Sequence, residues 1–217
     1  MASVPNGTDA SFFGKRPNMS DDDWDDEDEA GEGDELAALK LIPRFIAGAA
    51  GPFWFSAVGQ PIRGPLKGEA QAWLDALGFP DATAVALRDW REAAEAAEST
   101  GIDDIAFEAE EQLRAALTQD AIDLHGEDAV TVVLTHVAAE LGPSIGEAAL
   151  NATRVWGLDD MELVNAAAGA GIQACHNAAL LLLAGRAEDD HPFALKYRLF
   201  ERGRWPVTLI GSSLHLF

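Results

Sequence analysis

Cys175 and His176 are adjacent in the sequence and carry the side chains of a thiol nucleophile and an imidazole base. Nucleophilic catalysis requires these two groups within hydrogen-bonding distance. Neighbouring residues of a helix point about 100° apart, so these side chains cannot make that bond with each other. No second histidine can be assigned to the role from the sequence, and a free cysteine often packs as a small apolar side chain. The pair therefore predicts a buried cysteine rather than a catalytic dyad.

Two groups of residues carry side chains that bind metal ions. His136 and Glu140 lie four residues apart and therefore on one helical face. A second group surrounds a single turn: Asp120, Asp123, His125, Glu127 and Asp128. Neither group matches the Glu-x-x-His or His-Glu-x-x-His pattern, and the acidic turn lacks the spaced oxygen ligands of a calcium loop. Because carboxylates near helix ends are also ordinary capping groups, we expect no specific metal site.

The segment GAGIQA, residues 169–174, matches the dinucleotide-binding pattern G-x-G-x-x-A. Asp189 and Asp190 follow at about twenty residues, where a ribose-binding acid belongs. The pattern binds pyrophosphate only where a strand precedes the glycines, and the preceding DDMELVNAAA favours a helix instead. We therefore expect Gly169 and Gly171 to permit close helix packing, and we expect no cofactor.

A basic end containing aromatic residues closes this otherwise acidic chain. Five of the thirteen bases after residue 35 are clustered there: Arg186, Lys196, Arg198, Arg202 and Arg204. They could bind an anion, an acidic partner or the acidic N-terminal segment, and Arg198, Arg202 and Arg204 are the candidate contacts. The simpler interpretation is that these bases pair with surface carboxylates, each pair contributing little stability.

The densest charge lies in SDDDWDDEDEAGEGDEL, residues 20–36, which contains eleven acids. Residues 1–33 are predicted to be disordered, because Pro, Gly, Asn, Ser and like charges leave too little apolar surface to offset the entropy of ordering. An aromatic residue in such a segment either marks a docking point or is there by accident. The candidate partner-binding residues here are Trp24, Asp25, Asp26, Glu27 and Asp28. Without liganding geometry, these carboxylates favour diffuse attraction to a basic surface.

Composition excludes several classes of function. The 217 residues carry a net charge of -22, and residues 36–217 still hold 25 acids against 13 bases. This charge repels phosphate and anionic lipid, so we expect neither nucleic-acid nor membrane binding. The single cysteine excludes an intrachain disulfide and favours the reducing cytoplasm. The first twenty residues lack the apolar run of a secretion signal, and the longest apolar run, NAALLLLAG, is shorter than a membrane span.

The elements that carry these residues are predicted to be mainly helical. Residues 51–65, which include Phe53, Trp54 and Phe55, are predicted to form a buried loop or a short extended piece. Apolar periodicity, capping residues and glycine stops predict helices at 34–50 (interrupted by Pro43), 67–78, 81–99 (capped by Asp81), 101–126, 127–142, 143–157, 159–185 and 192–203. Residues 127–142 are ambiguous because of their β-branched side chains. Residues 159–185 form the longest and most apolar segment, and we expect them to be central.

The last residues, RWPVTLIGSSLHLF, predict a β-hairpin. A Gly211-Ser212 turn suits a type II′ hairpin. That register pairs Leu209 with Leu214 and Val207 with Leu216, which puts all four on one face. Because an isolated hairpin is marginally stable in water, we expect residues 206–217 to pack on the helices.

These patterns predict a mainly α fold, a single helical domain at 34–217 of seven to eight helices with a small C-terminal β-hairpin. The leading functional hypothesis is a non-enzymatic cytoplasmic interaction protein, such as an adaptor, inhibitor or immunity-type neutraliser, whose acidic surface engages a basic protein partner. The alternative is a small-molecule-binding protein or enzyme with a pocket between helices. Its predicted lining is aromatic: Phe53, Trp54, Phe55, Trp73, Trp90 and Trp156. Mimicry of nucleic acid would need acids on a rigid face, whereas the densest acids lie in the N-terminal segment.

Overall fold

Helices dominate the structure, as the periodicity predicts. The computed structural model describes residues 30–51, 54–98 and 105–217. Trp24, the acids up to Asp28, and Phe53 lie outside the described residues, so their predicted roles stay predictions. The described residues form seven helices and three strands: α1 (Ala30–Ala49), α2 (Pro65–Leu77), β1 (Thr83–Ala86), α3 (Trp90–Glu98), α4 (Ile105–His125), α5 (Glu127–Val155), α6 (Met161–Leu183), α7 (Pro192–Glu201), β2 (Pro206–Ile210) and β3 (Ser213–Leu216). The predicted mainly α class with a terminal β element is confirmed.

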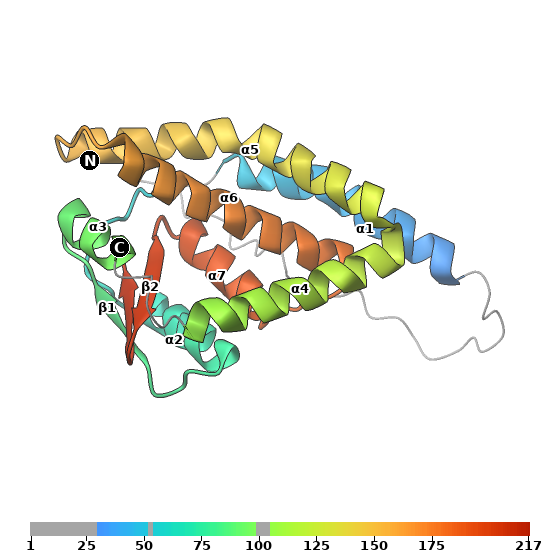
Figure 1. Ribbon diagram of the computed structural model, residues 1–217, viewed down its shortest axis with the longest axis horizontal. Helices are drawn as coiled ribbons and strands as arrows, with labels where there is room; N and C mark the ends of the chain where they lie inside the picture. Colours follow the sequence, from blue (N-terminus) through green and yellow to red (C-terminus); the bar gives the residue numbers. More distant parts are fainter. Residues whose placement is uncertain (1–29, 52–53, 99–104) are drawn as a thin grey trace, which may run out of the picture.

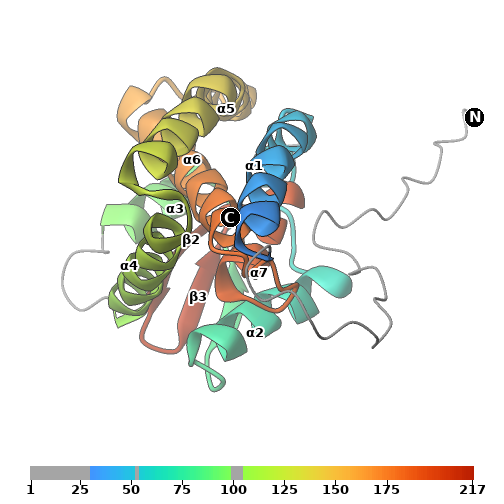
Figure 2. The same cartoon turned by 90° about the vertical axis from the view of Figure 1, so that its right-hand side faces the viewer.

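Helix α6 lies at the centre of the fold, as predicted for residues 159–185. It packs against α1, α4, α5 and α7, and it runs beside α5 in both views (Figure 1, Figure 2). Thirteen of its residues are buried. The chain has no charged side chain between Glu162 and Arg186, so nearly every face of this helix can meet a neighbour without burying a charge.

Both α5 and α6 are long and apolar enough to cross a membrane by length and composition. In α6 the apolar window is 67% buried inside the fold, and the core helix of a soluble protein meets the same criterion. In α5 only 22% of the window is buried. Two helices of this length and composition are therefore weak evidence for a membrane span.

Two helices predicted on either side of Pro143 form the single helix α5. A proline inside a helix costs about 3 kcal/mol, but Pro143 is exposed, and its neighbours Leu141 and Ile145 are 1% and 0% exposed. Burial of these flanking side chains offsets the lost hydrogen bond. Pro43 likewise lies inside α1, where an interruption was predicted, and α1 begins at Ala30, ahead of the predicted start.

The close packing predicted for the two glycines of GAGIQA holds for only one of them. A Cβ atom on Gly171 would lie 2.9 Å from Ile145 Cγ2 of α5, so Gly171 permits the approach of the two helices. A Cβ atom on Gly169 would meet nothing within 4 Å, so the prediction for that residue is wrong. Both glycines lie within α6, and no strand leads into them.

The predicted helix at 81–99 is wrong in its first half. Thr83–Ala86 form strand β1, which pairs in parallel with β3, and the helix begins only at Trp90. The hairpin offers an open edge on β3, and the β-branched Thr83 and Val85 suit a strand. Pairing with a distant segment therefore outweighs the local helical pattern, and the sheet has the order β1-β3-β2.

The C-terminal hairpin is confirmed in its turn and in half of its register. Leu209 pairs with Leu214, and Gly211 has a φ of 58°, as a type II′ turn requires. Leu216 pairs with Pro206 rather than with Val207, because the register shifts between Pro206 and Thr208. A β-bulge of this kind redirects the side chains beside it.

Buried apolar side chains form two clusters that meet at α7. The larger cluster surrounds α6 and takes Phe193, Tyr197 and Phe200 from α7. The smaller cluster lies between α2 and the sheet and takes Leu195 and Leu199 from the other side of the same helix. The predicted buried loop is confirmed at Trp54 and Phe55, which are 5% and 1% exposed in the larger cluster.

Candidate functional site

Cys175 and His176 do not form a catalytic pair. Cys175 is fully buried, and burial raises the pKa of its thiol to about 12, so the reactive thiolate is scarcely populated near neutral pH. Burial lowers the pKa of the His176 imidazole, and its Nε2 atom has no hydrogen-bond partner within residues 30–51, 54–98 and 105–217. The expectation of a structural cysteine agrees with this environment.

Five of the seven candidate metal ligands make ordinary contacts within the fold, whereas Glu127 and Asp128 are exposed. His136 Nδ1 lies 4.0 Å from Glu140 Oε1, and both side chains are exposed. In the acidic turn, Asp120 pairs with Arg186 at 2.9 Å, and His125 Nε2 lies 2.8 Å from the carbonyl oxygen of Leu183. No group of three or more His, Cys, Asp or Glu side chains among the described residues could hold a metal ion.

The basic C-terminal residues are engaged within the fold. Arg198 donates to the side chain and backbone of Asp189, and Arg202 pairs with Glu69 at 2.7 Å. Arg204 is only 2% exposed and donates to the carbonyl oxygen of Pro61 at 3.0 Å. Arg204 therefore has almost no surface with which to contact a partner, whereas partner binding by Arg198 or Arg202 would have to compete with their own ion pairs.

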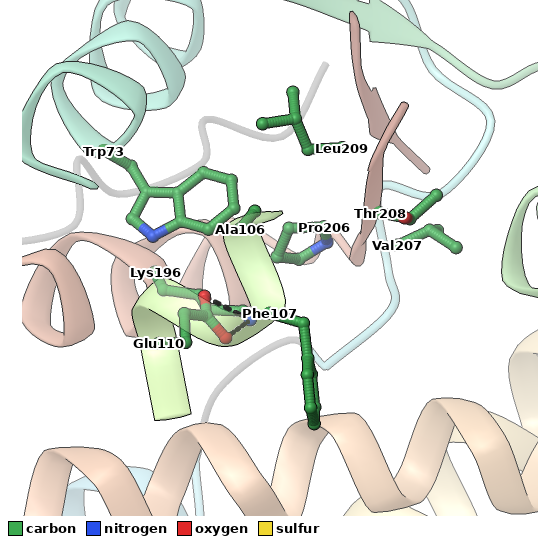
Figure 3. Close-up of a pocket in the computed structure, with 9 residues that line it drawn as sticks. All are labelled: Trp73, Ala106, Phe107, Glu110, Lys196, Pro206, Val207, Thr208 and Leu209. Atoms are coloured by element: carbon green, nitrogen blue, oxygen red, sulfur yellow. Dashed lines mark hydrogen bonds and ion pairs between the residues drawn. The ribbon is translucent and has the colours of Figure 1, made fainter. Parts of the chain in front are cut away.

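A pocket of about 280 Å³ lies where the two apolar clusters meet. We call it the groove and define it by Trp73 of α2, Phe107 and Glu110 of α4, Lys196 of α7 and residues 206–209 of β2. Figure 3 shows Trp73 and Phe107 on opposite sides of the Lys196–Glu110 pair. The residues of β2 lie across the groove from Trp73 and this pair. Helices α2 and α4 and the consecutive elements α7 and β2, three parts of the chain that are distant in the sequence, therefore build one site.

The charges of the groove neutralise one another. Lys196 Nζ lies 2.7 Å from both carboxylate oxygens of Glu110, and 5.4 Å from the centre of the Trp73 ring. The two charged side chains are only 20% and 15% exposed. A lysine held in this way by a carboxylate and an aromatic face acts as a structural cation, because its donors already have a partner.

Two buried polar atoms near the groove make no hydrogen bond with the part of the chain that the structure describes. Trp73 Nε1 is one, and Asn177 Oδ1 is the other. Asn177 lies in an adjoining pocket of about 260 Å³, which also touches Phe107, Glu110 and Lys196. A buried polar group without a partner costs about 1–3 kcal/mol. The groove and its extension thus offer aromatic walls, a neutralised ion pair and one buried amide, but no nucleophile paired with a base among the described residues.

A second region of interest is the connection between α5 and α6, which projects at one end of the molecule (Figure 1). We call it the tip and define it by Val155, Trp156, Leu158 and Met161, which are 85%, 45%, 37% and 53% exposed. Exposed apolar side chains are normal when scattered, whereas four within seven residues concentrate exposed apolar surface at one connection.

Local hydrogen bonds fix the backbone of the tip. The Gly157 amide donates to the carbonyl oxygen of Arg154, and the Leu158 amide donates to that of Thr153. With Gly157 at a φ of 72°, these bonds form the Schellman motif that ends many helices. The Asp160 side chain then caps α6 by accepting from two backbone amides. The apolar side chains are therefore presented on a rigid connection.

Trp156 is held from one side only. A Cβ atom on Gly59 would lie 2.8 Å from Trp156 Cζ2, and the ring centre lies 6.5 Å from that of Phe217. A pocket of about 300 Å³ opens beside the ring. Its lining joins the loop after α1 to the last turns of α5: Trp54, Phe55, Ser56, Val58, Ala148, Asn151, Ala152, Val155 and Trp156.

The predicted aromatic pocket is divided by the structure. Trp90 is fully buried against Trp205 and Phe217, whereas Trp73 lines the groove. Sequence reasoning missed Phe107 and the ion pair of the groove, because their partners come from distant elements. The tip did leave a signal, since apolar residues occupy a connection between helices where polar residues are usual. Comparison with family models, curated proteins and solved structures found no match to this chain.

Proposed function

We propose that this protein is a non-enzymatic interaction protein of the cytoplasm that engages a basic protein partner through its acidic surface. One observation carries the proposal: residues 105–217 use nearly all of their bases internally, while acids remain in excess over bases among the described residues. Of the seven bases in residues 105–217, all but Arg154 bond to a carboxylate or a carbonyl oxygen of the chain.

The remaining carboxylates support an outward role. The described residues contain 26 acids and 13 bases. Glu95, Glu98 and Glu108 are exposed, and none of these three side chains has an ion-pair partner among the described residues. Uncompensated surface charge of one sign steers a partner of the opposite sign and raises its association rate.

A second candidate function is the binding of a small molecule in the groove. It is favoured by the unpartnered Trp73 Nε1 and Asn177 Oδ1 atoms beside an aromatic wall. The neutralised Lys196–Glu110 pair would suit an uncharged ligand that combines an apolar body with a polar group. A screen by thermal shift would test it, with Trp73→Phe as the variant that removes the unpartnered donor.

Affinity capture with the full chain, followed by titration of the purified partner at several salt concentrations, tests the proposed function. We expect a partner with an excess of Lys and Arg, and a Kd that rises at least about tenfold as the salt goes from about 0.05 M to about 0.3 M. If no captured protein shows a salt-dependent affinity, the proposal is wrong.

A further inference from the structure

We propose that the tip is the docking surface of this protein and that its occupant is an amphipathic basic segment of a protein partner. This inference rests on the proposed function and identifies the surface that would bind the basic partner. The tip combines an exposed apolar patch with acids at its edge, whereas the groove holds its charges in an internal pair.

Trp156 provides the anchor of the surface. Its ring is fixed on one side by Gly59 and Phe217 and remains 45% exposed on the other. Tryptophan is enriched among the residues that dominate binding energy, and a side chain already held in place loses little entropy on binding. The pocket beside it, lined by Val58, Ala148 and Ala152, can receive an apolar side chain of the partner.

Carboxylates alternate with the apolar residues of the tip along the chain. Asp159, Asp160 and Glu162 are exposed and lie within the same connection, against the single base Arg154. Asp159 and Glu162 make no ion pair with the described residues, so they remain available to Lys or Arg side chains. An apolar centre with a charged rim is the usual anatomy of a protein interface, and here the rim is acidic.

Charge selects this occupant over two others. A lipid surface would have to receive three carboxylates together with the apolar residues, which is unfavourable. A second copy of the chain would bring an equal net charge of -22 toward the same patch. A basic segment with an apolar face satisfies both the patch and its rim.

The test measures binding of two labelled synthetic peptides of about 14 residues, or four helical turns, to the full chain by fluorescence anisotropy. One peptide is an amphipathic helix of Leu and Lys, and the other has Ser in place of Leu. We expect Trp156→Ala to raise the Kd of the Leu/Lys peptide at least about tenfold and to leave that of the Ser/Lys peptide within about twofold.

The matched control is Val132→Ser. Val132 lies on the same helix and is 67% exposed, but it belongs to neither the tip nor its pocket. We expect the Kd of the Val132→Ser variant for the Leu/Lys peptide to stay within about twofold of the wild-type value. Because Trp156→Ala could disturb packing at Gly59, the pair Val155→Ser and Met161→Ser repeats the test with exposed side chains, and we expect a rise of about three- to fivefold.

A charge series examines the rim. Asp159→Asn with Glu162→Gln should slow association and flatten the salt dependence of the Leu/Lys peptide. Glu127→Gln with Asp128→Asn, at the other end of α5, changes the net charge equally and should have a smaller effect.

The possible outcomes distinguish a wrong docking surface from a wrong proposed function. If tip and control variants bind the Leu/Lys peptide alike, the tip assignment is wrong, whereas the proposed function stands. If the full chain binds neither peptide at low salt, the proposed function fails as well. If Trp156→Ala instead abolishes binding to neutral vesicles, or abolishes self-association, without changing the peptide Kd, the occupant is lipid or a second copy and the proposal is overturned.

Discussion

The groove and the tip contain the same kinds of side chain and use them in opposite ways. In the groove, Lys196 and Glu110 neutralise each other at 2.7 Å beside Trp73. At the tip, Trp156 is half exposed and its neighbouring carboxylates point to solvent. An internal partner turns a charged residue into a structural element, whereas the lack of one leaves it for recognition.

The largest expected effect concerns the ion pair of the groove. Lys196→Met leaves the mostly buried Glu110 carboxylate without its partner and should lower the free energy of unfolding by about 3 kcal/mol. The double variant Lys196→Met with Glu110→Leu should recover most of that loss. Urea unfolding of the wild type, both single variants and the double variant measures the coupling. A double variant as unstable as Lys196→Met would contradict a structural role for the pair.

The two glycines of α6 provide a second and smaller contrast. Gly171→Ala places a Cβ atom against the buried Ile145 and should destabilise the protein by about 1–2 kcal/mol. Gly169→Ala meets no atom within 4 Å and should stabilise the helix by up to about 1 kcal/mol. Thermal unfolding compares them. Equal destabilisation by both would mean that α6 does not pack on α5 as described.

Glu201 extends the comparison, because it is a largely buried carboxylate that makes no ion pair with any described residue. Burial raises its pKa above 4.5, although Arg198 and Arg202 act in the opposite direction. The folded state therefore holds this proton more tightly than the unfolded state does. The stability contributed by the protonated group is full below about pH 4.5 and is lost as the pH rises through the folded pKa.

Glu201→Gln cannot ionise, so it should be more stable than wild type near neutral pH, and this difference should shrink as the pH falls toward 4.5. Urea unfolding from about pH 4 to about pH 8 measures it. A difference that grows on acidification would show that burial does not raise this pKa.

The smallest effect on stability is expected at the tip. Val155→Ser and Met161→Ser remove exposed side chains and should each change the free energy of unfolding by less than about 0.5 kcal/mol. Chemical denaturation checks this. A loss of more than about 1 kcal/mol for either would assign these residues to the fold rather than to recognition.

Local patterns predicted the parts of the fold that depend on neighbours in sequence. The apolar run of α6 and the Gly211 turn were both predicted from the sequence. Strand β1 was not, because Thr83 pairs with Ser213, a contact that only the tertiary fold creates. Its local pattern of alanines favoured a helix until that edge was present.

The candidate sites differ in the same way. The groove could not be predicted, because Trp73, Glu110 and Lys196 come from three helices, and spacing in the sequence does not join them. The tip lies within one connection, so its apolar residues can be read from the sequence once the ends of α5 and α6 are known. The helices predicted at 143–157 and 159–185 place Trp156 close to this connection, but its exposure depends on the tertiary packing and could not be predicted.

The most direct test of the difference between the two regions is a backbone amide chemical-shift map of the full chain during titration with the Leu/Lys peptide. We expect the shifts to concentrate in residues 148–164 and 54–59, which build the tip and its pocket. Shifts centred instead on residues 105–111, 192–198 and 206–209 would place recognition in the groove and contradict the docking surface proposed above.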